Sequence, residues 1–163
     1  MNTNLPKVMQ PLGGATLISH VINTAQKTST NITAVIGYEK KILKKLIHEA
    51  YPSIQTVEQE KQLGTAHAVK KAMHLIKPNE KVLVLYGDVP LITNKTIKSL
   101  ISSSKECCLL CMHLDDPTGY GRVMTNNKGH AIKIIEHKDA SDEQRKIHEV
   151  FTGTLVVEGQ LLI

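Results

Sequence analysis

The chain has 163 residues, 41% hydrophobic and 21% charged, a balance typical of one folded domain. Twenty Lys and Arg against 15 Asp and Glu give a net charge of +5, which suits phosphate-bearing ligands or nucleic acid. The lysines are scattered, and one Phe, four Tyr and no Trp offer little for base stacking, so nucleic acid is disfavoured. No apolar run could span a membrane, and the first ten residues do not resemble a secretory signal.

Periodic apolar residues predict alternating helices and strands up to about residue 114. Helices are expected over 15–27, 39–50, 65–76 and 94–104, and strands over 32–38, 54–57, from 81, and over 107–114. In the second helix, Ile42, Leu43, Leu46 and Ile47 are expected on one apolar side. The alternation predicts an α/β fold with a largely parallel sheet, in which the strand from Lys81 is covered on both faces.

The pattern changes after Asp115. A hairpin is expected over 122–138, with Asn and Gly at its tip, followed by a weak helix over 140–150 and a strand over 152–159. The chain ends in the apolar run QLLI, which would need something to pack on, so we expect a truncation.

Three cysteines, Cys107, Cys108 and Cys111, lie in one apolar segment. An odd number without an extracellular signal indicates a reducing compartment, which here means the cytoplasm. On a strand, Cys107 and Cys111 would face one way and Cys108 the other, a poor arrangement for zinc. We expect them to be core residues.

The segment YGDVP, Tyr86 to Pro90, follows an apolar strand at its carboxyl end, where ligands bind in open α/β sheets. Gly87 allows the backbone close to a ligand, and Asp88 could hold Mg²⁺. Alternatively, Asp88 caps the following turn.

Three other segments have a simple structural interpretation beside a functional one. Gly64 and Thr65 open a helix, where Thr65 can act as the cap and an anion can bind, although a plain helix start is the simpler interpretation. The loop 115–123 is a turn or a backbone surface for a ligand. Glu136 is either a solvated strand end or an acceptor for sugar hydroxyls, and His137 forms no recognisable triad. His67 and His74 are interpreted as structural or surface residues.

The motifs LPKVMQPLGG, QLGTAHA, VLYGDVPLI, LDDPTGYGRV, IIEHKDASDEQRKI and TGTLVV follow one another in the order of a single family. Over nearly its whole length the chain resembles the uridyltransferase domain of the bacterial bifunctional N-acetylglucosamine-1-phosphate uridyltransferase / glucosamine-1-phosphate acetyltransferase. This implies a Rossmann-like nucleotide-diphospho-sugar transferase fold and Mg²⁺. It also implies the reaction of UTP with N-acetylglucosamine-1-phosphate to UDP-N-acetylglucosamine and pyrophosphate, for peptidoglycan and lipopolysaccharide precursors.

The resemblance also implies residue roles. Lys7 would lie near the nucleotide phosphates, and Gln59, Gly64 and Thr65 would recognise the uracil nucleotide.

The other implied roles concern the sugar side. Tyr86, Gly87 and Asp88 would form the sugar-nucleotide segment, with Asp88 as the Mg²⁺ ligand. Gly121 and Glu136 would hold the N-acetylglucosamine.

The chain departs from the family at three places. The family has a buried strand and a glycine-rich LxxGxGTRM loop before its LPK, whereas only MNTN precedes Leu5 here. Phe151 stands where the family has a sugar-binding Asn, and Ile163 comes before the second Mg²⁺ ligand and the acetyltransferase β-helix. We therefore expect a partial nucleotidyltransferase domain over residues 1–163 with no confidently retained catalytic residue. Because the lost strand is central, it should be marginally stable or pair its strands otherwise.

Three functional hypotheses follow. The first is a uridyltransferase of this family, here an incomplete piece with weak or no turnover. The second is a non-catalytic remnant that binds a sugar nucleotide. The third is a basic nucleic-acid-binding domain, against which the scattered lysines argue.

Overall fold

The computed structural model describes residues 5–103 and 106–163. The helices are α1 (Leu17–Ala25), α2 (Lys40–Ala50), α3 (Thr65–Ala72), α4 (Asn94–Ser103) and α5 (Asp142–Arg145). The strands are β1 (Pro11–Leu12), β2 (Ala15–Thr16), β3 (Thr33–Ile36), β4 (Gln55–Glu58), β5 (Lys81–Val84), β6 (Cys107–His113), β7 (Arg122–Thr125), β8 (Ala131–Ile135) and β9 (Glu149–Glu158). The predicted α/β class and nearly every predicted element are confirmed. Of the helix expected over 94–104, Ser104 lies outside the described residues.

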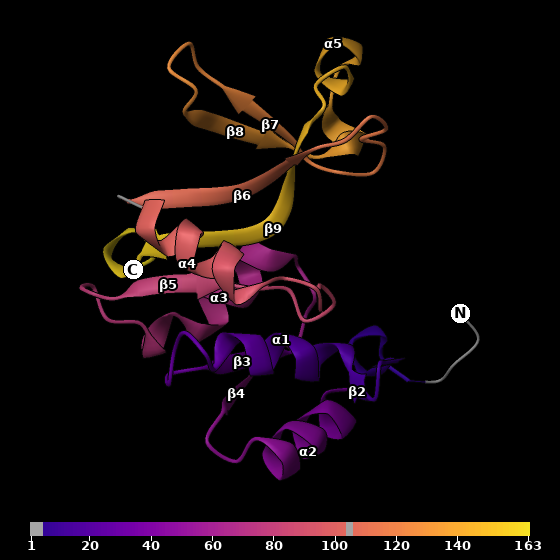
Figure 1. Cartoon of the computed structure of the whole chain (residues 1–163), viewed down its shortest axis with the longest axis vertical. Helices are drawn as coiled ribbons and strands as arrows, with labels where there is room; N and C mark the ends of the chain where they lie inside the picture. Colours follow the sequence, from indigo (N-terminus) through magenta and orange to yellow (C-terminus); the bar gives the residue numbers. More distant parts are fainter. Residues whose placement is uncertain (1–4, 104–105) are drawn as a thin grey trace.

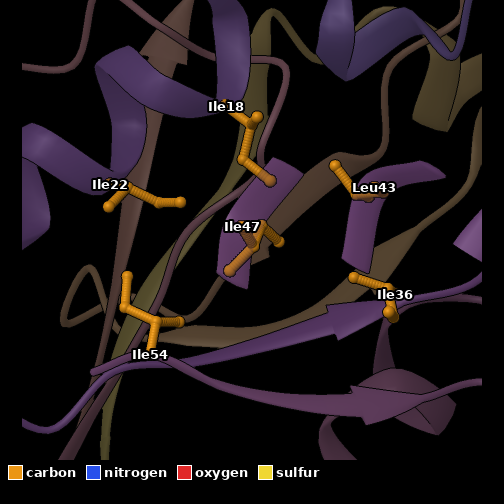
Figure 2. Packing of buried hydrophobic residues seen from close by; sticks show 6 residues of the cluster. All are labelled: Ile18, Ile22, Ile36, Leu43, Ile47 and Ile54. Carbon is orange, nitrogen blue, oxygen red and sulfur yellow. The ribbon is translucent and has the colours of Figure 1, made fainter. Parts of the chain in front are cut away.

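The amino-terminal half is built on one apolar cluster. Figure 2 shows six side chains from α1, α2, β3 and the residue before β4 pointing toward one another: Ile18, Ile22, Ile36, Leu43, Ile47 and Ile54. Leu43 and Ile47 are four residues apart, so they share the inward side of α2. Ile42 is 45% exposed, so its predicted place on that side is wrong. One helical residue turns the side chain by about 100°, which carries Ile42 off the buried stripe.

Strand β9 organises the carboxy-terminal half. One of its edges pairs along its length with β6, and the other pairs with β5 and, at Val150, with β7; all three pairings are antiparallel. Strands β5 and β6 therefore run in the same direction with β9 inserted between them. The expected parallel pairing is seen directly between β3 and β4. The long return strand β9 makes its own pairs with β5, β6 and β7 antiparallel, and β1–β2 and β7–β8 are antiparallel hairpins.

Strands β3 and β5 belong to different sheets. Figure 1 shows β3, β4, α1 and α2 at one end of the molecule and the five-stranded sheet beside and above them. Within the described residues no alternative pairing joins β3 to β5, so the chain does not close the gap by re-pairing, and the other branch of the expectation, marginal stability, stays a prediction. Val82, Leu83 and Val84 are only half-buried, so the strand from Lys81 is not covered on both faces as predicted. With one pairing edge each, β3 and β5 lack the neighbours that would bury them.

The hairpin of β7 and β8 confirms the predicted turn, with Gly129 at its tip at a φ of 76°. No helix in the described part of the chain is long and apolar enough to cross a bilayer. A short β1–β2 hairpin around Gly13 and Gly14, both with positive φ, is a feature that the sequence did not predict.

The three cysteines are free but are not core residues. Cys107 is exposed, and Cys108 and Cys111 are half-buried. Among the described strands β6 pairs with β9 alone, so it is an edge strand with less cover than a central one. The register shifts between Leu109 and Cys111, so the argument from alternating faces does not hold along the whole strand. Partial burial raises the pKa of the Cys107 and Cys111 thiols.

Candidate nucleotide-sugar site

Lys7 and Asp88 meet at the carboxyl end of β5. The Lys7 ammonium lies 2.6 Å from the Asp88 carboxylate, with side chains 68% and 29% exposed. Gly87 packs closely on the segment that carries Lys7, because a Cβ on it would lie 3.3 Å from a Val8 methyl carbon. The Val89 N–H donates a hydrogen bond to the Tyr86 carbonyl and closes the turn, while the Asp88 carboxylate faces Lys7.

This carboxylate is a candidate for one metal ligand. Across residues 5–103 and 106–163 no three His, Cys, Asp or Glu side chains converge as a metal site. Mg²⁺ usually keeps several waters and is bound through one or two carboxylates plus substrate phosphates. Asp88 therefore fits a metal that arrives with a nucleotide, and Lys7 must yield part of its contact.

Tyr86 and Thr65 join the turn after β5 to the start of α3. Their hydroxyl groups lie 2.7 Å apart. Of the two interpretations of this segment, the Thr65 cap is wrong, because Gly64 is the N-cap, at a φ of 95°, and no side-chain hydrogen bond caps the helix. The Thr65 hydroxyl is turned to Tyr86 instead.

Gln59 holds the loop that leads into α3. Its Nε2 donates to the Gly64 carbonyl at 3.1 Å and lies 2.9 Å from His67 Nδ1. His67 thus has the structural contact that the sequence suggested. The amide of Gln59 fixes the backbone beside Thr65. The resemblance implies four nucleotide positions, and they lie on segments that meet around Tyr86 and Asp88: Lys7, Gln59, Gly64 and Thr65.

Gly153 seats the Tyr86 ring against β9, a role that the sequence analysis missed. Gly153 has a φ of 90°, and a Cβ on it would lie 2.4 Å from a Tyr86 ring carbon. The available signal was a glycine inside a strand, which often marks a close approach.

Gly121 and Glu136 form a second group, at the base of the β7–β8 hairpin. A Cβ on Gly121 would lie 3.7 Å from both Glu136 carboxylate oxygens and 3.0 Å from Ile134. Glu136 is exposed at the end of β8, so its carboxylate is available to a ligand. The Phe151 N–H donates to the Gly121 carbonyl at 3.0 Å.

The two groups are connected through β9. Phe151 bonds to Gly121, and two residues later Gly153 packs on Tyr86. A ligand that reached from Asp88 to Glu136 would therefore cross this part of β9. Phe151 uses its backbone for the contact to Gly121, which any residue other than proline can make.

The loop before Gly121 is also held by a local contact. The Thr118 backbone N–H donates to the Asp116 carboxylate at 3.0 Å. The Thr118 side chain and backbone hydrogen bonds hold the pKa of Asp116 below its usual value. Asp116 thus stays ionised and keeps the loop in its turn conformation.

The fold and these segments define a nucleotidyltransferase domain. The sequence profile of the family described as the MobA-like NTP transferase domain matches residues 1–147. The chain belongs to this family.

Two curated relatives match nearly the whole chain. The bifunctional protein GlmU of Cellvibrio japonicus is 39% identical over 99% of the chain, and that of Burkholderia ambifaria is 43% identical over 99%. The resemblance drawn from the motifs is thereby confirmed. The chain spans 36% of the length of each of these relatives.

A solved structure confirms the fold. UDP-glucose pyrophosphorylase complexed with UDP-glucose superposes with a TM-score of 0.72 at 17% identity, covering 97% of this chain and 70% of that one. The predicted nucleotide-diphospho-sugar transferase fold is therefore correct.

Proposed function

We propose that the chain is the nucleotide- and sugar-binding part of a uridylyltransferase. Its ligands are UTP, N-acetylglucosamine-1-phosphate and UDP-N-acetylglucosamine, with Mg²⁺ as cofactor, and residues 1–163 act as one partial nucleotidyltransferase domain. The observation that carries the proposal is the Lys7–Asp88 pair, a cation and a carboxylate brought together at the carboxyl end of an apolar strand. The GlmU relatives support the choice of ligands.

In the proposed reaction, a phosphate oxygen of the sugar phosphate attacks the α-phosphorus of UTP. The new P–O bond replaces the bond to the β-phosphate, and pyrophosphate leaves. Catalysis of this kind depends on positioning and on neutralising phosphate charge. Lys7 supplies one positive charge, and Asp88 supplies a ligand for a Mg²⁺ ion that would offset more.

The sugar side of the site is assigned to Glu136 and Gly121. A carboxylate accepts two hydrogen bonds from neighbouring sugar hydroxyls, and a glycine lets the ring or its substituents approach the backbone. Tyr86 packs on Gly153, two residues after the Phe151 that is hydrogen-bonded to Gly121, so β9 links Asp88's segment to this pair.

We further propose that turnover by this chain is weak or absent. Asp88 is already engaged by Lys7, and the described residues hold no group of three or more His, Cys, Asp or Glu side chains that could bind a metal before substrate arrives. The competing candidate, a sugar-nucleotide-binding protein without catalysis, also rests on the engagement of Asp88 by Lys7.

Two measurements on the full chain separate these candidates. Calorimetric titration with UDP-N-acetylglucosamine and Mg²⁺ should show binding, which Asp88→Asn weakens and the remote Glu49→Gln leaves unchanged. Pyrophosphate release from UTP and N-acetylglucosamine-1-phosphate should stay far below the usual enzyme range of about 1–10³ s⁻¹. Turnover within that range would contradict the weak activity, and no binding by the folded chain would contradict the proposed function.

A further inference from the structure

Arg122, the first residue of β7, is the largest fully buried side chain in the described part of the protein. Its exposure is 1%. None of the ion pairs formed by the described residues includes its guanidinium. Its Nε is buried without a hydrogen-bond partner. Burying a cation without a paired carboxylate is expensive, and an apolar side chain of similar volume would be the more stable choice.

The guanidinium instead holds three chain segments. One terminal nitrogen donates to the Tyr120 carbonyl. The other donates to His137 Nδ1 at 3.2 Å and to the Arg145 carbonyl at 3.4 Å. These partners belong to the loop before β7, the 3₁₀ turn His137–Asp139 and the end of α5.

Two of these partners are next to the residues assigned to the sugar. Tyr120 precedes Gly121, and His137 follows Glu136. The guanidinium of Arg122 therefore binds the residue before Gly121 and the residue after Glu136, and Arg122 itself follows Gly121 directly in the chain. A planar guanidinium can serve several fixed acceptors at once, which a lysine ammonium does less well.

We propose that Arg122 is a positioning residue that holds Gly121 and Glu136 side by side, where both can contact one sugar. The proposal rests on the proposed function for its ligand, a sugar carrying a phosphate. It also has a consequence independent of any ligand. Arginine has no acceptor, so His137 Nδ1 must accept, and the neutral imidazole carries its proton on Nε2.

Nitrogen NMR of the 163-residue chain labelled at histidine tests this consequence. The His137 signals are assigned by their loss in His137→Gln. We expect a single Nε2–H tautomer in the wild type and loss of that preference in Arg122→Lys. A Nδ1–H form or a tautomer mixture in the wild type would overturn the proposal.

A matched pair at half-buried His137 tests the positioning without changing the buried arginine. Glutamine offers Arg122 an acceptor oxygen, whereas leucine fills a comparable volume and offers none. Binding of UDP-N-acetylglucosamine should stay within about two-fold of wild type in His137→Gln and weaken about ten-fold in His137→Leu. Equal affinities of the two variants would overturn the proposal.

The two failures can be told apart. If the wild type binds no UDP-N-acetylglucosamine, the proposed function fails. The backbone amide signal of Gly121 then tests whether Arg122 positions Gly121. That signal should move in His137→Leu and stay in place in His137→Gln. An unmoved signal in both variants would refute the positioning role, whatever the ligand.

Discussion

Lys7 and Asp88 are 81 positions apart in the sequence, and their charged atoms lie 2.6 Å apart in the folded chain. The pair ties the segment before α1 to the end of β5. It also means that the proposed metal ligand has a cation beside it before any metal or nucleotide binds.

Removing Lys7 should therefore improve the binding of a divalent cation in the absence of nucleotide. An exposed ion pair contributes about 0.2–1 kcal/mol, so Lys7→Gln should bind Mn²⁺ up to about five-fold more tightly. Paramagnetic resonance of free Mn²⁺ measures this. Lys45→Gln, which removes the partner of Glu49 on α2, should not change it. Unchanged or weaker Mn²⁺ binding in Lys7→Gln would show that Lys7 does not compete for Asp88.

A methyl group on Gly153 should displace the Tyr86 ring. Gly153→Ala combines a positive φ with a contact of 2.4 Å, whereas Gly14 has the same φ of 90° and nothing within 4 Å. The difference between the two alanine variants isolates the clash. We expect Gly153→Ala to lower the free energy of unfolding by about 1–3 kcal/mol more than Gly14→Ala does. Urea denaturation measures both, and equal losses would show that Tyr86 moves aside freely.

The acid sensitivity of the fold should depend in part on Glu58. Lys40 lies 2.7 Å from Glu58, and its hydrogen bond, followed by its charge, lowers the pKa of that carboxyl; the same contact raises the pKa of Lys40. A lowered folded-state pKa stabilises the protein above the unfolded value and loses that effect as pH falls through the folded value. The Lys40 contribution is lost only at alkaline pH, as pH rises through its raised pKa.

Wild type should consequently lose more stability than Glu58→Gln between about pH 5 and pH 3. Thermal unfolding at a series of pH values measures the difference, which should shrink in high salt because both side chains are exposed to solvent. If the two proteins lose the same stability as pH falls through this range, the Lys40–Glu58 pair does not contribute to folding.

The chain should be only marginally stable. Strands β3 and β5 each have one unpaired edge among the described residues, and the apolar β5 is half-buried. We expect a free energy of unfolding below about 8 kcal/mol, in the lower part of the range for natural domains. Reversible urea unfolding that extrapolates above this value would contradict the expectation.

Most of the elements could be predicted because apolar side chains recur with the period of each helix or strand. The parallel β3–β4 pair and the β7–β8 hairpin follow from local spacing and turn residues. The insertion of β9 between β5 and β6 could not be predicted this way, because it joins segments far apart in the chain. The prediction that the cysteines are buried was wrong for the same reason, because the exposure of Cys107 depends on β6 being at the edge of the sheet.

The candidate site was predicted from motifs, and its internal contacts were not. Asp88 stands where a ligand was expected, but its pairing with Lys7 depends on tertiary structure. A cap by Thr65 was one of two interpretations, and its hydroxyl instead lies against the Tyr86 hydroxyl. Gly153 and Arg122 were missed because their importance lies in what packs against them, which no local pattern records.

Binding of UDP-N-acetylglucosamine, followed by NMR on the full chain with Mg²⁺, tests whether Asp88 and Glu136 belong to one site. We expect saturable shifts in the amides of Gly87, Asp88, Gly121 and Glu136 together, with both sets weakened in Asp88→Asn. Shifts confined to one of the two groups, or none in the folded protein, would contradict a single site that spans β9.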